Sequence, residues 1–360
     1  MLTRIGRGRA ALAATAAVSL ALVGCASNDA TAPGASAGQS TTTVLAGQPD
    51  VNGDGKVVIG VLSPGDINDK GYYESFVVGA ETFAKQKGWE IIKRGKVPLS
   101  EALNAARALC QQGVDMVALG ASELKDAIPA SEEPVCAKTA WYVPSSENIA
   151  QTPRVMLSND DPSHAAFAGG YAAGLLMKEQ NATKAGFVTG LEVDFAINAA
   201  KGFKAGIRMA VPQADVVTTY TGDFDDSAKA REAVQAQMSQ GAKVIFPYLG
   251  GATDAATKLA NSRNMVTLTP GTDRCASTDP RFDISVIYDP GVYFTSALNL
   301  FADGQLTLGT TKKWRLGVDP YPAIKFCADK AELAKQMETF VADIASGKIN
   351  IAAEIDRLGS

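Results

Sequence analysis

The chain has 360 residues, a formal net charge of −4 and a single histidine. This length suffices for two domains of ordinary size, and the acidic balance, without a basic patch interleaved with aromatic residues, argues against nucleic acid as a partner. No nucleophile elbow, phosphate-binding loop or paired metal ligands stand out, so we expect a protein that is not an enzyme and that has no cofactor and no metal site.

The first residues have the features of an exported lipoprotein. Arginines precede an apolar run at 10–23, which is too short to span a membrane comfortably and is typical of a secretory signal peptide. The run ends in Leu-Val-Gly-Cys, which resembles a bacterial lipobox. We therefore expect a signal peptide at 1–24 and a lipid on Cys25. The alternative is a signal peptide cut elsewhere, which leaves Cys25 as a free thiol.

A flexible tether is expected at residues 25–53. This stretch is rich in Ser, Thr, Ala, Gly and Pro and has almost no large apolar residues, so it cannot bury enough surface to fold. A tether of this kind would hold a globular body at the outer face of the cytoplasmic membrane. Residues 50–55 open like a calcium loop, but Val61 stands where the loop requires Glu, so a polar turn is favoured.

Beyond the tether, short β-branched runs alternate with helical patterns. In the first part, strands are predicted at 57–62, 89–92, 115–119, 139–143 and 154–157, and helices at 72–87, 100–112 (with Ser100 as its cap) and 123–130. The rhythm then restarts, with helices at 163–178, 196–209, 227–240 and 253–262 and strands at 185–189, 215–220, 244–248 and 265–269. The last predicted elements are a strand at 283–287, a helix at 291–302, a strand at 314–318 and a helix at 330–346.

This alternation predicts an α/β protein with two Rossmann-like lobes. Strands that alternate with helices form parallel sheets, and two blocks of similar length indicate two similar lobes. We expect lobe 1 at 54–160 and lobe 2 at 161–287, each completed by part of 288–350. Ligands of open α/β sheets lie beyond the carboxyl ends of the strands, which in a two-lobed protein face each other across a cleft.

Four cysteines remain after Cys25, an even number that indicates two disulfides in an exported chain. The sequence allows three pairings. Cys110 with Cys136 and Cys275 with Cys327 are favoured because the members of each pair fall in the same expected lobe. The competing interpretation is four free, buried thiols.

The loop after the first predicted strand is a candidate ligand site. It carries Asn68, Asp69, Tyr72 and Tyr73, whose polar groups can bind hydroxyls or ring nitrogens and whose rings can stack on a flat base or sugar. Acidic capping of a helix would also explain Asp69. Farther along, Asp160 is a candidate hinge or cleft residue, although Ser163 behind Pro162 would serve equally well as a helix cap.

An ordered series of motifs resembles the basic membrane protein family of ABC-transporter lipoproteins, which includes purine nucleoside receptors. The loop Ile-Asn-Asp-Lys-Gly-Tyr-Tyr-Glu at 67–74 is similar to the family's Asp-Lys-Ser-Phe-Asn-Gln. The further matching segments are 167–174, 186–190, 202–206, 222–226, 241–246 and 271–273. The resemblance covers about residues 57–320.

The resemblance implies a type I periplasmic-binding-protein fold whose two lobes close on a nucleoside. Phe195 and Phe224 would add rings from the second lobe, Asp273 would bind the ribose hydroxyls, and Gly250 would let the ligand approach the backbone. The candidate ligand-binding residues are Asn68, Asp69, Tyr72, Tyr73, Asp160, Phe195, Phe224, Gly250, Asp273 and Tyr288.

Three departures from the family pattern concern the ligand. The family's Phe-Asn is Tyr72-Tyr73 here, its Gln is Glu74, and a common Lys is Tyr288. The expected function is that of a monomeric, lipid-anchored receptor that binds a nucleoside- or sugar-like molecule and delivers it to an ABC permease. The alternatives are a sugar-binding or sensory lipoprotein of the same fold, or a nucleoside hydrolase that uses acidic residues with calcium.

Overall fold

The computed structural model describes residues 47–144 and 148–360. The predicted signal peptide, Cys25 and most of the predicted tether lie outside the described residues. Within them, no helix is long and apolar enough to cross a membrane. Residues 47–53 pack against the folded body rather than extending from it: Val51 is buried, and its backbone N–H donates to Asp115 Oδ1 at 3.1 Å. The packed part of the chain therefore begins before the expected residue 54.

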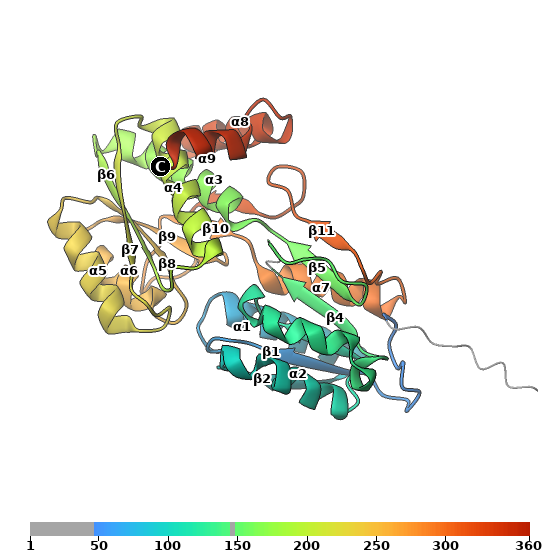
Figure 1. Cartoon of the computed structure of the whole chain (residues 1–360). Helices are drawn as coiled ribbons and strands as arrows, with labels where there is room; N and C mark the ends of the chain where they lie inside the picture. The colour runs from blue at the N-terminus through green and yellow to red at the C-terminus, as the bar shows by residue number, and fades with distance from the viewer. Residues whose placement is uncertain (1–46, 145–147) are drawn as a thin grey trace, which may run out of the picture. The chain divides into compact units, whose positions relative to one another are not determined.

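The first of two six-stranded sheets has the strand order β11-β5-β4-β3-β1-β2, and all its neighbours are parallel (Figure 1). Its strands are β1 (Val58–Leu62), β2 (Glu90–Arg94), β3 (Met116–Leu119), β4 (Ala140–Pro144), β5 (Val155–Asn159) and β11 (Thr311–Lys313). The central strands are apolar along their whole length because helices cover both faces of the sheet.

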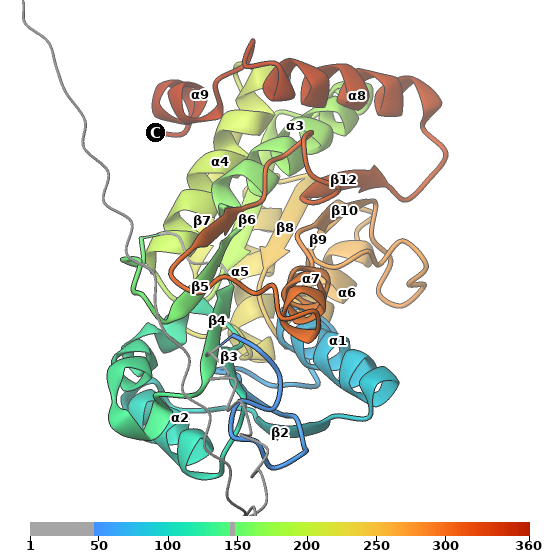
Figure 2. The same ribbon diagram turned by 90° about the vertical axis from the view of Figure 1, so that its right-hand side faces the viewer.

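Successive side chains of β1 face opposite layers of helices. Ile59 and Val61 pack with α1 (Tyr72–Lys87) and α7 (Pro290–Ala302), which lie side by side in Figure 2. Leu62 packs with the layer on the other face. That layer contains η1 (Leu99–Glu101), α2 (Ala102–Gln111), η2 (Ser122–Glu132) and η3 (Pro134–Cys136).

The second sheet has the order β12-β10-β9-β8-β6-β7, and only its edge strand β12 runs antiparallel to its neighbour. Its strands are β6 (Lys184–Thr189), β7 (Asp215–Tyr220), β8 (Val244–Tyr248), β9 (Val266–Gly271), β10 (Ile284–Ile287) and β12 (Ala323–Phe326). Its helices are α3 (Pro162–Glu179), α4 (Asp194–Ala210), α5 (Ser227–Ser239), α6 (Thr253–Asn261), α8 (Ala331–Ala345) and α9 (Ile351–Leu358).

The two sheets repeat one topology. Numbered within its own half, each has the strand order 2-1-3-4-5, one of the common orders of doubly wound α/β folds, plus a sixth strand from the C-terminal part of the chain. The chain passes between the sheets after β5, after β10 and between β11 and β12. The predicted α/β fold with two Rossmann-like lobes is confirmed.

Four local predictions differ from the structure. No strand occupies 314–318; short strands precede and follow this segment, and α9 was not predicted. The predicted α-helix at 123–130 belongs to a 3-10 helix that contains Pro129, which cannot donate a backbone hydrogen bond. Ser100 lies inside a short 3-10 turn and does not cap α2. Asp161, not Ser163, caps α3, since its side chain accepts from the backbone N–H of Ser163.

Both disulfides favoured from the sequence are present, Cys110–Cys136 and Cys275–Cys327. The first joins α2 to the short η3 turn beside the first sheet. The second joins the loop after β9 to the end of β12 and so ties the antiparallel edge strand to the second sheet. Each disulfide stabilises its own half by about 2–4 kcal/mol.

Candidate functional site

A cavity lies where loops from both sheets meet. The lining residues are Tyr72, Tyr73, Ala121, Ser122, Glu123, Pro162, Phe195, Phe224, Tyr248, Leu249, Gly250, Pro270 and Tyr288. All of them lie at or soon after the carboxyl end of a strand, the place where doubly wound sheets bind their ligands.

Aromatic rings from both halves of the chain form much of the wall. The ring of Tyr72, at the start of α1, lies 6.2 Å from that of Tyr288, which follows β10. Tyr288 in turn lies 6.2 Å from Tyr248 at the end of β8. Phe195 and Phe224 stack on each other with their centroids 5.8 Å apart. Such a wall can contact a flat ring on more than one side.

Glu123 is the one carboxylate among the described residues that line the cavity, and none of those residues is Lys, Arg or His. It opens the 3-10 helix after β3, and its Oε1 accepts a hydrogen bond of 3.0 Å from the Tyr73 hydroxyl. Burial raises the pKa of Glu123, and burial together with the adjacent carboxylate raises the pKa of Tyr73. The pair places an acceptor and a neutral phenol at the boundary between cavity and protein.

Asp69 and Asn68 do not line the cavity. Asp69 accepts hydrogen bonds from the backbone N–H groups of Gly71, Tyr73 and Glu74, so it satisfies free donors at the start of α1. This is the capping role that the sequence left open. Burial nevertheless raises the pKa of Asp69 against the effect of those hydrogen bonds. Asn68 is exposed and bonds to Asp66.

The structure gives Asp273 a different environment from the one expected of a ribose ligand. Its carboxylate accepts hydrogen bonds from Lys325 Nζ at 2.8 Å, from the backbone N–H of Cys275 and from the Ser285 hydroxyl, and it does not line the cavity. Burial acts in the opposite direction, but these donors hold the pKa of Asp273 below its usual value. The carboxylate connects the loop after β9 to β12 beside the second disulfide.

Asp160 also lies away from the cavity lining. It is 1% exposed and follows β5, where the chain passes from the first sheet to α3 of the second. Burial raises the pKa of Tyr288, and the nearby charge of Asp160 adds to this rise.

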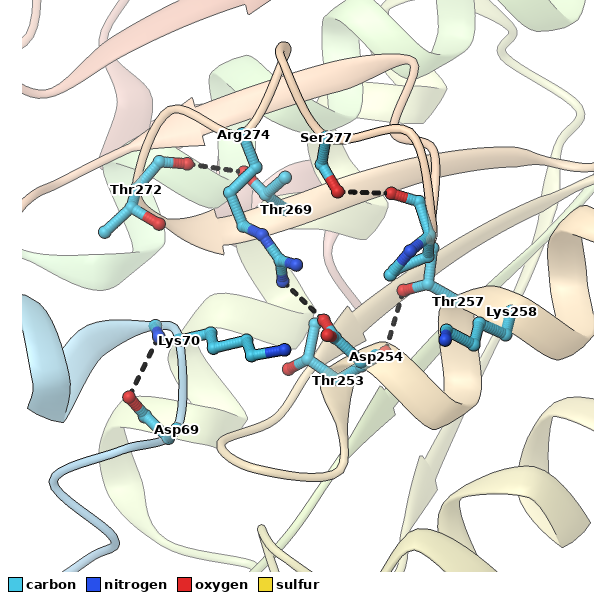
Figure 3. Close-up of polar contacts among 12 residues, drawn as sticks. Asp69, Lys70, Thr253, Asp254, Thr257, Lys258, Thr269, Thr272, Arg274 and Ser277 are labelled. Atoms are coloured by element: carbon cyan, nitrogen blue, oxygen red, sulfur yellow. Dashed lines mark hydrogen bonds and ion pairs between the residues drawn. The ribbon is translucent and has the colours of Figure 1, made fainter.

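A polar cluster brings the β1–α1 loop toward the second sheet (Figure 3). Lys70 has a positive φ of 54°, and its side chain points toward Thr253 and Asp254 at the start of α6. Asp254 accepts a hydrogen bond of 2.6 Å from Arg274 Nη1, and this ion pair is largely shielded from solvent. The cluster thus places positive and negative groups from the two halves of the chain near each other.

Six of the ten candidate residues line the cavity: Tyr72, Tyr73, Phe195, Phe224, Gly250 and Tyr288. Ser122, Glu123 and Tyr248 also bring polar groups to the cavity and were not predicted from the sequence. They lie close to the carboxyl end of a predicted strand, so the rule that singled out the loop after β1 also applies to the loops after β3 and β8.

The family comparison agrees with this geometry. The family described as "ABC transporter substrate-binding protein PnrA-like" matches residues 56–351. The chain belongs to this family. Its members are solute-binding proteins of ABC transporters rather than enzymes, and they act outside the cytoplasm. The match covers both sheets and every residue that lines the cavity.

Similar sequences include the "ABC transporter nucleoside-binding protein BmpA" of Lactococcus lactis subsp. cremoris, which is 26% identical over 67% of this chain and 64% of the relative. The "CD4+ T-cell-stimulating antigen" of Listeria monocytogenes is 25% identical over 53% of this chain and 54% of the relative. The chain therefore spans less than two thirds of the length of each.

Solved structures show the same fold. An ABC transporter solute-binding protein from Conexibacter woesei matches with a TM-score of 0.63 and 21% identity over 82% of this chain and 98% of the other. A second, from Aeropyrum pernix, matches with a TM-score of 0.67 and 15% identity over 84% of this chain and 90% of the other. At these identities the likeness concerns the fold alone.

Proposed function

We propose that this member of the substrate-binding family binds a nucleoside-like molecule in the aromatic cavity and delivers it to an ABC permease at the outer face of the membrane. The observation that supports this most is the cavity wall, to which both halves of the chain contribute aromatic rings. A base is flat on both faces and can stack between such rings, and Tyr72, Tyr248 and Tyr288 bring hydroxyl groups to the wall.

Two alternatives, a sugar ligand and a calcium-dependent hydrolase, agree less well with the residues of the site. Sugars stack well on one ring face, and related folds include an arabinose-bound protein from Burkholderia graminis, but the rings here come from several directions. A hydrolase that uses calcium would need clustered acidic ligands. Among residues 47–144 and 148–360, no group of three His, Cys, Asp or Glu residues that could hold a metal ion is found.

Membrane attachment through a lipid on Cys25 forms part of the proposal. A lipid-anchored receptor stays close to its permease, and a tether over residues 26–46 would leave the folded body free to rotate. Incorporation of a labelled fatty acid that disappears in Cys25→Ala would support this attachment. Incorporation that persists in that variant would contradict it.

Thermal unfolding against nucleosides, free bases, ribose and other sugars tests the ligand class. A ligand at a hundred times its dissociation constant adds about 2.7 kcal/mol of stability. We expect nucleosides to raise the melting temperature and Phe224→Ala, which shortens a cavity residue, to reduce that rise. Leu191→Ala is the matched control, because Leu191 is 39% exposed and does not line the cavity. A rise with sugars alone would contradict the nucleoside proposal.

A further inference from the structure

The charges around the cavity restrict what it can hold. Glu123 is the one ionisable acid or base besides the tyrosines among the described residues that line it. None of those lining residues is Lys, Arg or His. Among the cations on neighbouring loops, Arg274 pairs with Asp254, Lys96 pairs with Asp66 at 2.9 Å, and Lys70 points toward Thr253 and Asp254 (Figure 3). A phosphate or carboxylate of a ligand would enter this space without a positive partner, which disfavours its binding.

Glu123 also differs from the other polar groups of the wall in the hydrogen bonds it can make. The hydroxyls of Tyr72, Tyr248, Tyr288 and Ser122 either donate or accept, so they tolerate many ligand edges. An ionised carboxylate only accepts, and it offers about four sites for donors. The Tyr73 hydroxyl occupies one of them at 3.0 Å. The wall therefore has one group that, when ionised, only accepts hydrogen bonds and has acceptor sites left for a ligand donor.

The position of Glu123 is well defined. Ala121 and Leu124, which flank Ser122 and Glu123 in the sequence, are buried, with 3% and 0% of their surface exposed. Packing therefore fixes the backbone on both sides of Glu123. The bond from Tyr73, on α1, orients the carboxylate from a second element. Side chains held in this way discriminate between ligands because they cannot turn to suit a different edge.

We propose that Glu123 is the specificity-determining residue of the cavity and selects an unphosphorylated, flat ligand that presents two adjacent N–H donors, the edge that guanine carries. A ring N–H beside an amino group matches the two oxygens of a carboxylate. Adenine instead places a ring acceptor beside its amino group, and that acceptor would face the carboxylate. This inference rests on the proposed nucleoside function. It adds which edge of the base is recognised and which residue accepts its hydrogen bonds.

Titration calorimetry of the purified chain and of Glu123→Gln tests the inference. The ligands are guanosine, inosine, adenosine and guanosine 5′-monophosphate. Inosine keeps the ring N–H but lacks the amino group. For the wild-type protein we expect guanosine to bind about 10- to 100-fold more tightly than adenosine, with inosine between them and the monophosphate at least about tenfold weaker than guanosine.

In Glu123→Gln the preference for guanosine over adenosine should fall to within about threefold, because the amide presents a donor where the carboxylate accepts.

Nucleoside binding without this preference in the wild type, or a preference that persists in Glu123→Gln, would overturn the inference and leave the proposed function standing. Monophosphate binding as tight as guanosine would overturn the argument from charge. No binding of any nucleoside would overturn the proposed function as well. The wild-type ratios decide the question even if the variant does not fold.

Discussion

At the scale of single residues, the cavity combines neutral rings with one carboxylate of altered acidity. Burial raises the pKa of Glu123 above its reference value of 4.5. The group that faces it directly is the Tyr73 hydroxyl on α1, whose pKa burial raises well above 10.0, so this phenol stays neutral near pH 7. Asp69 and Asp225 add negative charge around Tyr73. The site is therefore sensitive to acid through its carboxylates.

Nucleoside affinity should fall on acidification. A ligand that donates N–H groups binds the ionised form of Glu123, so affinity is complete above the raised pKa and is lost as the pH falls through it. Calorimetry from pH 7.5 down to about pH 4.5 should show this loss in the wild type and a flatter profile in Glu123→Gln. If affinity fell at low pH in the variant as it does in the wild type, the loss would be caused by protonation of another group, such as Asp69.

Replacement of Asp273 should affect stability rather than affinity. Its carboxylate accepts from Lys325, Cys275 and Ser285 and does not line the cavity, so the role in ribose binding expected from the family pattern is not reflected in its contacts. Because the Asp273–Lys325 pair is about half exposed, we expect Asp273→Ala to cost about 1 kcal/mol of unfolding free energy.

The pKa of Asp273 is lowered on folding, so this contribution is present above its unfolded pKa near 3.8 and is lost as the pH falls further. Urea unfolding and nucleoside titration of Asp273→Ala measure the two effects separately. Lys325→Ala is the control, since it removes the same ion pair from β12. Loss of affinity by more than about tenfold, without loss of stability, would restore Asp273 as a ligand residue.

At the scale of elements, glycines let two helices of the second sheet approach closely. A Cβ on Gly206 of α4 would lie 1.9 Å from the backbone oxygen of Phe167 on α3, and one on Gly202 would lie 2.3 Å from the oxygen of Ser163. Backbone atoms cannot move aside as a flexible side chain can. Phe195 lies on the first turn of α4, so this helix contact also positions part of the cavity wall.

Gly206→Ala should therefore destabilise the protein. Overpacking of a buried contact typically costs about 1–3 kcal/mol, and the close approach to a backbone oxygen favours the upper part of that range. Chemical unfolding measures the loss. Lys201→Ala, at an exposed position of the same helix, is the control and should change stability by less than about 0.5 kcal/mol. A Gly206→Ala variant as stable as the control would contradict this packing of α3 on α4.

Much of the fold followed from the sequence because buried parallel strands and amphipathic helices leave strong patterns. The strands over 215–220 and 244–248 and the helix over 72–87 have the predicted limits. The edge strand β11, Thr-Lys-Lys, carries no apolar pattern, because it lies at the sheet margin and is largely exposed, so it was missed. The cavity was predicted in part, because Glu123 and Tyr248 come together only through the packing of two distant segments.

At the scale of the whole molecule, the described body consists of two sheets joined by three passages of the chain, with the cavity lined from both. A ligand that touches both halves stabilises the arrangement in which they lie close together, by its differential affinity for that arrangement. Lys70, from the first half, points toward Asp254 of the second half, which pairs with Arg274 (Figure 3).

Ligand binding should therefore contract the protein. We expect the radius of gyration from X-ray scattering to decrease when a nucleoside saturates the wild-type protein, because closure removes solvent from between the halves. Phe224→Ala, at a ligand concentration that leaves it unoccupied, is the control and should show no change. A scattering profile that stays the same with saturating ligand would argue against hinge closure and leave binding itself untouched.

The central claim is that a nucleoside lies among the rings of this cavity, and a crystal structure of the protein grown with saturating guanosine tests it most directly. We predict a base within contact distance of Tyr72, Tyr248 and Tyr288, with its donor edge facing Glu123. An empty cavity at a guanosine concentration that saturates binding in solution, or a nucleoside bound elsewhere on the protein, would contradict the claim.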